Sequence, residues 1–503
     1  MRFQLILSAT LAASVSANPL SKRAAIDDCL KSAGVPVDTR GSNDWTSDVR
    51  PFNQRLPYTP VAIAVPTSIE HVQGAVSCAA KVGLKVNPKS GGHSYASFGL
   101  GGENGHLIVE LDRMSKVTLD SSTNIATVQA GARLGHVATA LYNQGKRAFS
   151  HGTCPGCAHL CPFSSVGVGG HSLHGGFGFS SHTYGLAVDW IVGATVVLAN
   201  GTVVETSETV NPQLFWAMRG AGSSFGIVVV FKFNTFAAPS QVTAFQVNLP
   251  WNSASSIASG WTIIQDWVQN TMPKEMNARV FGSPSQTQIQ GLYHGNSNNM
   301  RTAIQPLLSK LGASLSNSQQ YDWMGAFSYY TYGGTVDVTH PYNSVETFYS
   351  KSLVTTALPS NVMQNVGQYW MSRAKSTNRD WYIIIDFYGG VNSATTKVPA
   401  NATSYAYRGD KLWLYEFYDR VNSGSYPSNG FSFLDGWVKT FTDGLTTSQW
   451  GMYINYADPT MSRADAQNVY YRQSLNKLKV LKAQYDPTEV FYYPQSIEPA
   501  TLT

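Results

Sequence analysis

Charged side chains are scarce in this sequence of 503 residues, and no cluster of basic residues stands out. Lys, Arg, Asp and Glu together make up 13% of the chain, which is about half of the share usual in soluble domains. Aromatic residues, in contrast, make up 12%. Disordered chains are rich in charge and poor in aromatic residues, so this class is excluded. The lack of a basic run argues against a protein that binds nucleic acid.

The sequence also lacks a hydrophobic run long enough to span a membrane. The apolar run at residues 3–15 is shorter than the roughly 20 residues that a membrane helix needs. It follows Arg2 and ends in small residues, as secretory signal peptides do, and the dibasic pair Lys22 and Arg23 indicates a processing site. We therefore predict that residues 1–23 are the signal peptide and pro-segment of a secreted protein without a membrane anchor. The alternative is a structured N-terminal strand.

Local patterns predict helices and strands along the whole remaining chain. Thr67 and Glu70 have capping-box spacing at the start of an amphipathic helix. Asn200 and Gly201 predict a hairpin turn between two strands. Later segments predict strands at 381–387 and 412–417, and helices at 431–441 and 464–482.

The composition changes near residue 237, beyond which aromatic residues accumulate between alternating strands and helices. We predict two α+β domains, at 24–236 and 237–462. The last segment, 463–503, is expected to return to the first domain. We also expect a monomer.

Glycine is concentrated in two segments, at 90–93 and 167–178, with a third short segment at 131–135. Glycine lets backbone N–H groups approach a phosphate closely. Neither of the first two segments is a P-loop or a clean dinucleotide-binding fingerprint, and for either one alone a structural loop is the better interpretation. Together they indicate a pyrophosphate-containing cofactor that is held by loops.

Residues 89–95 and 150–155 closely resemble the fungal berberine-bridge-enzyme-like flavoprotein oxidases, above all the gluco- and chitooligosaccharide oxidases. The resemblance continues at 185–189, 214–216, 386–390, 417–419 and 455–458, so it covers nearly the whole mature chain. It implies a two-domain PCMH-type FAD-binding fold of the vanillyl-alcohol oxidase superfamily, in which the antiparallel sheet of the substrate domain covers the flavin.

The resemblance further implies that FAD is attached twice, through His93 and Cys154. An imidazole and a thiolate are nucleophiles suited to an electron-poor flavin. The alternatives are a loop histidine and a buried thiol. The other residues implied in cofactor binding are Ser90, Gly91, Gly92, Ser94, Gly131, Val166, Gly167, Gly169, Gly170, His171, Gly175, Gly226, Ile227 and Tyr493.

The resemblance implies that Tyr456 is the catalytic base and that Asp386 assists it. Tyr456 would take the proton of the anomeric hydroxyl while the C1 hydride goes to the flavin, which gives a lactone. Dioxygen would then reoxidise the flavin to yield hydrogen peroxide. Because phenols have a pKa near 10, a carboxylate or other polar groups must make Tyr456 competent. The alternative is an ordinary packed tyrosine.

The oligosaccharide is expected to bind a groove whose aromatic rings stack on sugars; the candidates are Tyr95, Trp381, Tyr382 and Tyr415. Three groove positions depart from the glucooligosaccharide pattern, namely Phe281, Ile384 and Glu416. Cello-, xylo- and chito-oligosaccharides therefore all stay open as substrates. Two further alternatives are a flavoprotein that acts on a non-sugar alcohol or as a dehydrogenase, and a non-catalytic carbohydrate-binding protein.

A second departure is an insert between Pro155 and Val166, which contains Cys157, His159 and Cys161. The first hypothesis is that residues 157–165 are intron sequence retained in the gene model. The second is a tolerated loop, which a disulfide between Cys157 and Cys161 could close. The third is a metal site. The third comes last because a fourth ligand is missing, and we predict no metal. An insert at this place could move Cys154 or Val166 away from the flavin.

The remaining cysteines and two sequons fit an exported protein. Cys29 and Cys78 match the structural disulfide of the family, and disulfides are favourable outside the cytosol. Asn200 and Asn401 each begin an Asn-X-Thr triplet, so we predict glycosylation there.

Overall fold

The computed structural model describes residues 19–152, 166–330 and 345–501. The part between residues 37 and 234 contains two β-sheets. The first sheet has the strand order β1-β2-β4-β3, in which β2 and β3 run parallel to β4. The second is antiparallel, with the order β5-β6-β10-β8-β9. The strands are β1 (Val37–Asp38), β2 (Ala62–Ala64), β3 (Val86–Lys89), β4 (Leu107–Glu110), β5 (Val117–Asp120), β6 (Ile125–Gln129), β8 (Ile191–Val197), β9 (Val203–Thr206) and β10 (Ile227–Asn234).

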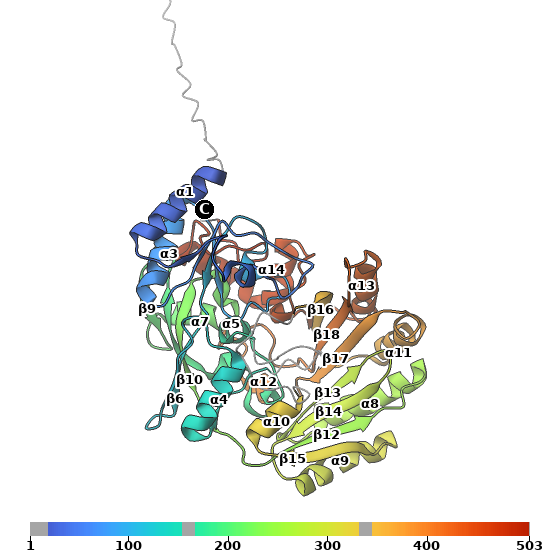
Figure 1. Cartoon of the computed structure of the whole chain (residues 1–503). Coiled ribbons are helices and arrows are strands. Elements are labelled where there is room, and N and C mark those ends of the chain that lie inside the picture. The colour runs from blue at the N-terminus through green and yellow to red at the C-terminus, as the bar shows by residue number, and fades with distance from the viewer. Residues whose placement is uncertain (1–18, 153–165, 331–344, 502–503) are drawn as a thin grey trace, which may run out of the picture.

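Helices cover this pair of sheets and bury their apolar faces (Figure 1). Helix α3 is capped by Ser68, whose hydroxyl accepts the N–H of His71 at 3.4 Å, so the cap lies one residue after the predicted Thr67. It ends at Gly83, which has φ of +70°. The helices are α1 (Pro19–Ser32), α2 (Trp45–Asp48), α3 (Ile69–Val82), α4 (Leu134–Gly145), α5 (Val168–Leu173), α6 (Ser181–Tyr184) and α7 (Pro212–Ala221).

A large antiparallel sheet forms the other half of the molecule, with the order β15-β12-β14-β13-β17-β18-β16-β19. The long helices α8, α9, α11 and α13 lie along its outer side (Figure 1). The strands are β12 (Val242–Asn248), β13 (Met276–Gly282), β14 (Thr287–Tyr293), β15 (Leu315–Tyr321), β16 (Thr347–Thr355), β17 (Asp380–Phe387), β18 (Trp413–Val421) and β19 (Trp450–Gly451). The helices are α8 (Ala254–Asn270), α9 (Ser297–Leu311), α10 (Trp323–Tyr330), α11 (Ser360–Tyr369), α12 (Ala394–Lys397) and α13 (Asn429–Thr442). A two-stranded pair, β7 (Arg147–Ala148) and β11 (Phe236–Ala237), joins the two halves.

The C-terminal segment lies against the first two sheets. The N–H of Val86 donates to the carbonyl of Val490 at 2.8 Å, and the buried Lys482 donates to the carbonyl of Ser224 at 2.6 Å. The predicted single helix at 464–482 is two helices, α14 (Arg463–Tyr471) and α15 (Leu475–Tyr485). The break lies at Arg472, whose φ of +43° is incompatible with a continuous α-helix.

The predicted disulfide between Cys29 and Cys78 is present and ties α1 to α3. The predicted leader falls mostly on residues 1–18, outside the described residues, whereas Lys22 and Arg23 lie within α1. Within the described part of the chain, no helix has both the length and the apolar character needed to cross a bilayer.

Replacing Cys29 by alanine is expected to lower the free energy of unfolding by about 2–4 kcal/mol, because the bridge closes a long loop in the unfolded chain. The sequence separation of the bridge is 49 residues. Denaturant unfolding followed by fluorescence measures the loss. The double variant with Cys78→Ala tests the assignment, since most of its loss should already occur in the single variant. Full stability of Cys29→Ala would contradict a stabilising bridge.

Candidate functional site

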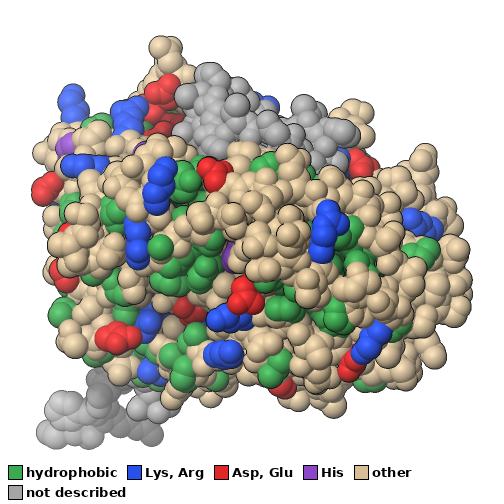
Figure 2. All heavy atoms as spheres, turned by 90° about the horizontal axis from the view of Figure 1, so that it is seen from below, with side chains coloured by type: hydrophobic (Ala, Val, Ile, Leu, Met, Phe, Trp, Pro, Cys, Tyr) green, Lys and Arg blue, Asp and Glu red, His purple; other side chains and the backbone are tan. Residues whose placement is uncertain are grey.

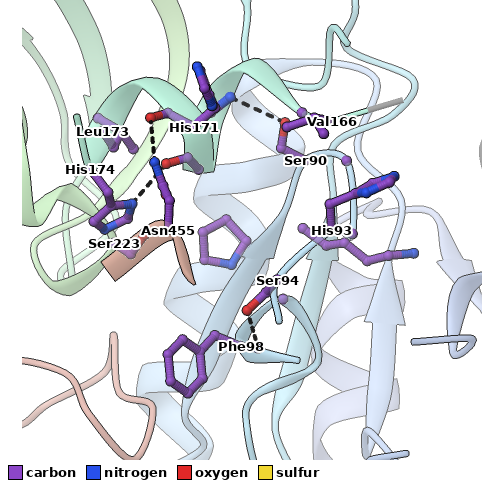
Figure 3. A pocket seen from close by; sticks show the side chains of 18 of the residues that line it. Ser90, His93, Ser94, Phe98, Val166, His171, Leu173, His174, Ser223 and Asn455 are labelled. Atoms are coloured by element: carbon purple, nitrogen blue, oxygen red, sulfur yellow. Dashed lines mark hydrogen bonds between the residues drawn. The ribbon is translucent and has the colours of Figure 1, made fainter. Parts of the chain in front are cut away.

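A cavity opens where the loop after β3 meets the glycine-rich segment around α5 (Figure 3). Residues 454–456 and Tyr493, from the C-terminal part of the chain, also line it. The predicted residues that line it are Ser90, Gly91, Gly92, His93, Ser94, Tyr95, Val166, Gly167, Gly169, Gly170, His171, Gly226, Tyr456 and Tyr493. The structure therefore brings together most of the cofactor residues expected from sequence.

Three predicted cofactor residues lie elsewhere among the described residues, and Cys154 lies outside them. A Cβ on Gly131 would stand 1.7 Å from the carbonyl oxygen of Leu111, so this glycine serves backbone packing. Gly175, with φ of +114°, packs against the rings of Tyr405 and Tyr453. Ile227 is fully buried in β10. The insert at 157–165 also lies outside the described residues.

The two glycine-rich loops pack backbone against backbone. A Cβ on Gly167 would lie 2.1 Å from the nitrogen of Gly91, so only glycine fits there. The hydroxyl of Ser90 donates to the carbonyl of Ala130 at 2.5 Å, and Arg133 donates to the carbonyl of Gly91 at 3.0 Å. At Gly170, in contrast, a Cβ would meet nothing within 4 Å. The loops thus form a cavity wall of bare backbone, which suits the close approach of a dinucleotide phosphate.

The histidines around the cavity are held neutral by burial. Burial, with help from the nearby Arg133 and Lys89, lowers the pKa of His93 to about 3. Burial also lowers the pKa of His171 to about 3, and its Nε2 accepts the N–H of Gly152 at 2.8 Å. His174, which sequence reasoning did not single out, donates from Nδ1 to the carbonyl of Gly170 at 2.8 Å. A neutral His93 keeps a nucleophilic nitrogen, as attachment to a flavin requires.

Strand register places the catalytic and substrate candidates on one face of the large sheet. Arg279 of β13 pairs with Asp386 of β17, and Ile384 pairs with both Phe281 and Glu416 on its two neighbours. Directly paired residues point to the same face of a sheet, and alternate residues along a strand share it. Tyr95 and Tyr456 pack against this face, in one cluster with Phe281, Tyr382 and Ile384.

Asp386 and Glu416 form a buried acidic pair on this face. Burial raises the pKa of Asp386 to about 7, which the nearby Arg279 opposes and Glu416 reinforces. Burial also raises the pKa of Glu416 to about 7, although one of its oxygens accepts the hydroxyls of Tyr95 at 2.8 Å and Tyr382 at 3.1 Å. Arg279, a residue that the sequence did not suggest, donates two N–H groups to the side-chain oxygen of Gln290. Both carboxyls can therefore gain or lose a proton near neutral pH.

Tyr456 lies at the junction of the cavity and this face. Its ring stacks on Tyr95, with centroids 5.5 Å apart, and meets Tyr453 edge-on at 5.3 Å. The hydroxyl of Tyr453 accepts three N–H groups, from Gly176 at 2.8 Å, Phe177 at 3.1 Å and the Asn455 amide at 2.9 Å. These bonds fix residues 453–456 to the glycine-rich segment. The 455–458 motif was visible in the sequence, but nothing there marked Tyr453.

The expected sugar-stacking aromatics divide between two faces. Trp381 and Tyr415 are buried in the main core on the opposite face of the sheet, so their prediction as groove residues is wrong. Tyr382 lies on the site face, but its ring stacks on Tyr418 with centroids 4.6 Å apart. One face of the Tyr382 ring is therefore covered by Tyr418, and the hydroxyl of Tyr382 is turned toward Glu416.

Comparisons with known proteins identify the families that this chain matches. Residues 60–207 match the FAD binding domain family, and residues 452–498 match the family of berberine and berberine-like proteins. A xylooligosaccharide oxidase from Thermothelomyces thermophilus is 62% identical over 502 residues, which cover 99% of this chain and 99% of that protein.

Solved structures show the same fold. Xylooligosaccharide oxidase from Myceliophthora thermophila C1, in complex with xylobiose, has a TM-score of 0.92 at 62% identity, with 95% of this chain and 100% of that chain covered. A glucooligosaccharide oxidase from Acremonium strictum with 6-S-cysteinyl, 8α-N1-histidyl FAD has a TM-score of 0.90 at 42% identity, with 95% and 100% covered. The predicted α+β fold of the PCMH type is confirmed.

Proposed function

The chain belongs to the berberine-bridge-enzyme-like FAD-linked oligosaccharide oxidases, and from this premise we propose that it oxidises the anomeric hydroxyl at the reducing end of an oligosaccharide to the lactone. Dioxygen is the electron acceptor in this proposal, and hydrogen peroxide is the second product. The observation that carries it is the position of Tyr456, which both lines the cofactor cavity and packs against the face that bears Asp386. A base at this junction would contact both the cofactor and the sugar.

FAD, when bound, accepts the hydride from C1 of the sugar and passes two electrons to dioxygen. The loop at 90–94 and the glycines around α5 would hold its phosphates and ribityl chain. We propose attachment through His93 and Cys154, as predicted from sequence. The neutral state of His93 supports the first bond, and the doubly linked FAD of the glucooligosaccharide oxidase supports both.

The proton of the anomeric hydroxyl passes to the phenolic oxygen of Tyr456 in this proposal, while the phenol's own proton passes to the carboxylate of Asp386. A phenol is a weak acceptor near pH 7 unless hydrogen bonds or a carboxylate assist it. The hydroxyl of Tyr95 is turned toward Glu416, so Tyr95 contributes the flat ring against which Tyr456 is oriented.

Xylo-oligosaccharides are the substrate class that we propose. The relative that is 62% identical is a xylooligosaccharide oxidase, and a structure of the same identity was solved with xylobiose. On the site face, Phe281 and Ile384 present apolar surface. Such surface suits a pentose, because the additional hydroxyl of a hexose unit would lose its hydrogen bonds with water without finding a partner.

Peroxide release from xylobiose, cellobiose and chitobiose tests the proposal. We expect kcat/KM to be highest for xylobiose, with formation of the corresponding aldonic acid after the lactone hydrolyses. An artificial electron acceptor in the absence of oxygen serves as the control for the oxidase assignment. Faster turnover with that acceptor than with air would identify a dehydrogenase, and a preference for cellobiose or chitobiose would overturn the substrate class.

Secretion and glycosylation belong to the same proposal. The side chains of Asn200 and Asn401 are both exposed, as glycan attachment requires. On the face shown in Figure 2, basic and acidic side chains are interspersed among neutral ones. Such a surface suits an extracellular enzyme that acts alone on a neutral sugar, and we propose a monomer.

A further inference from the structure

Phe52 lies directly against the imidazole of His93. The two ring centroids are 4.5 Å apart with an interplanar angle of 29°, so one face of the imidazole is covered by the phenyl ring. Phe52 is itself buried, at 6% exposure. It precedes the segment that matches the FAD binding domain family, which begins at residue 60, and no sequence motif drew attention to it.

The backbone around Phe52 is fixed on two sides. The N–H of Glu346 donates to the carbonyl of Phe52 at 2.9 Å, and the N–H of Gln54 donates to the carbonyl of Glu346 at 2.8 Å. The buried amide of Asn53 donates to the carbonyl of Tyr95 at 2.8 Å. The phenyl ring is therefore tied to the loop that carries His93 and, through residue 346, to the start of β16 in the large sheet.

Two cations act on the same imidazole. Lys89 forms a buried ion pair with Glu110 and donates to the carbonyl of Asp48 at 3.0 Å, and Arg133 donates to the carbonyl of Gly91. Both positive charges disfavour a second positive charge on His93. Burial and these two charges together keep the imidazole neutral, while the stacked ring restricts the plane in which it lies.

We propose that Phe52 is a positioning residue for the covalent attachment of FAD to His93. By covering one face of the imidazole, it holds a ring nitrogen toward the 8α carbon of FAD in the cavity. In the attachment, a bond forms between that nitrogen and the 8α carbon, and an N–H and an 8α C–H bond are broken. The two electrons and two protons released pass through the flavin to dioxygen and leave as hydrogen peroxide. This inference rests on the proposed attachment of FAD to His93.

The test measures how much flavin stays on the polypeptide after denaturation. A Cys154→Ser background removes the second proposed attachment, so that flavin fluorescence of the denatured band reports His93 alone. In this background, Phe52→Leu is expected to lower the covalently retained fraction by about threefold or more, because small errors in orientation strongly slow a bond-forming step. FAD bound before denaturation, and the thermal unfolding midpoint, should change little.

Phe98→Leu is the matched control, since the ring of Phe98 lies in the lining of the cavity and contacts Tyr493 in a tilted arrangement, with centroids 4.5 Å apart. It should keep the retained fraction. Equal retention in Phe52→Leu and its parent, or an equal loss in Phe98→Leu, would overturn the role of Phe52. If the parent retains no flavin, or retains it after His93→Ala, the proposed attachment to His93 itself is wrong, and the inference falls with it.

Discussion

Tyr456→Phe is expected to lower kcat for oligosaccharide oxidation by roughly 10²–10⁴-fold, the usual contribution of a positioned general base. The variant keeps the ring that stacks on Tyr95 and meets Tyr453, and removes only the oxygen that would receive the proton. FAD content and the unfolding midpoint should therefore stay near those of the parent. Steady-state peroxide release, together with the rate of flavin reduction after mixing with substrate, measures the loss at the chemical step.

Tyr142→Phe is the matched control for this prediction. It also removes one hydroxyl, which donates to Asp322 at 3.1 Å on an exposed part of the molecule. We expect its kcat to equal that of the parent. Turnover of Tyr456→Phe within about threefold of the parent would exclude Tyr456 as the base, and a larger effect on KM than on kcat would indicate a role in sugar binding.

The sequence predicted the elements of the fold well because their signals are local. The hairpin at Asn200 and Gly201 is present, with Gly201 at φ of +80°. The break at Arg472 was missed because the pattern of apolar residues continues through it. No local preference of arginine signals a positive φ, so the break depends on tertiary packing.

The candidate site was predicted in its parts but not in its arrangement. Tyr456, Asp386 and Glu416 came from motifs, whereas the pairing of Asp386 with Arg279 depends on a strand register between residues more than a hundred positions apart. The error on Trp381 and Tyr415 was avoidable. Side chains alternate along a strand, so a site at Asp386 and Glu416 already places these two aromatics on the other face.

The activity of the parent enzyme is expected to fall as the pH is lowered through about 7, because Asp386 assists the base only as a carboxylate. Burial raises its pKa to about 7, so the protonated form dominates below that value. The side chain of the Asp386→Asn variant cannot ionise, so the fall in activity at low pH, the acid limb of the pH profile, should disappear. The variant's kcat at pH 8 should be lower than that of the parent by roughly 10²-fold. The pH dependence of kcat and of kcat/KM between about pH 5 and 9 measures both effects.

Glu416→Gln is the matched comparison, because it changes the neighbouring acid to its amide without removing Asp386. The negative charge of Glu416 raises the pKa of Asp386, so its loss should move the acid limb to lower pH while kcat at pH 8 is largely kept. An acid limb that survives in Asp386→Asn but disappears in Glu416→Gln would exchange the roles of the two residues.

Stability should vary with pH in the same window and provides a readout that does not need substrate. In the unfolded chain the Asp386 carboxyl ionises near its usual pKa of 3.8 and in the folded protein near 7. Between these values the folded state binds more protons, so the free energy of unfolding falls as the pH rises from about 4 to 7. Asp386→Asn should reduce this slope, and the part due to Glu416, whose pKa burial also raises to about 7, should remain. If it reduces the slope without affecting turnover, Asp386 is a buried acid with no part in the chemistry; if both change together, the same carboxyl contributes to the pH dependence of stability and of catalysis.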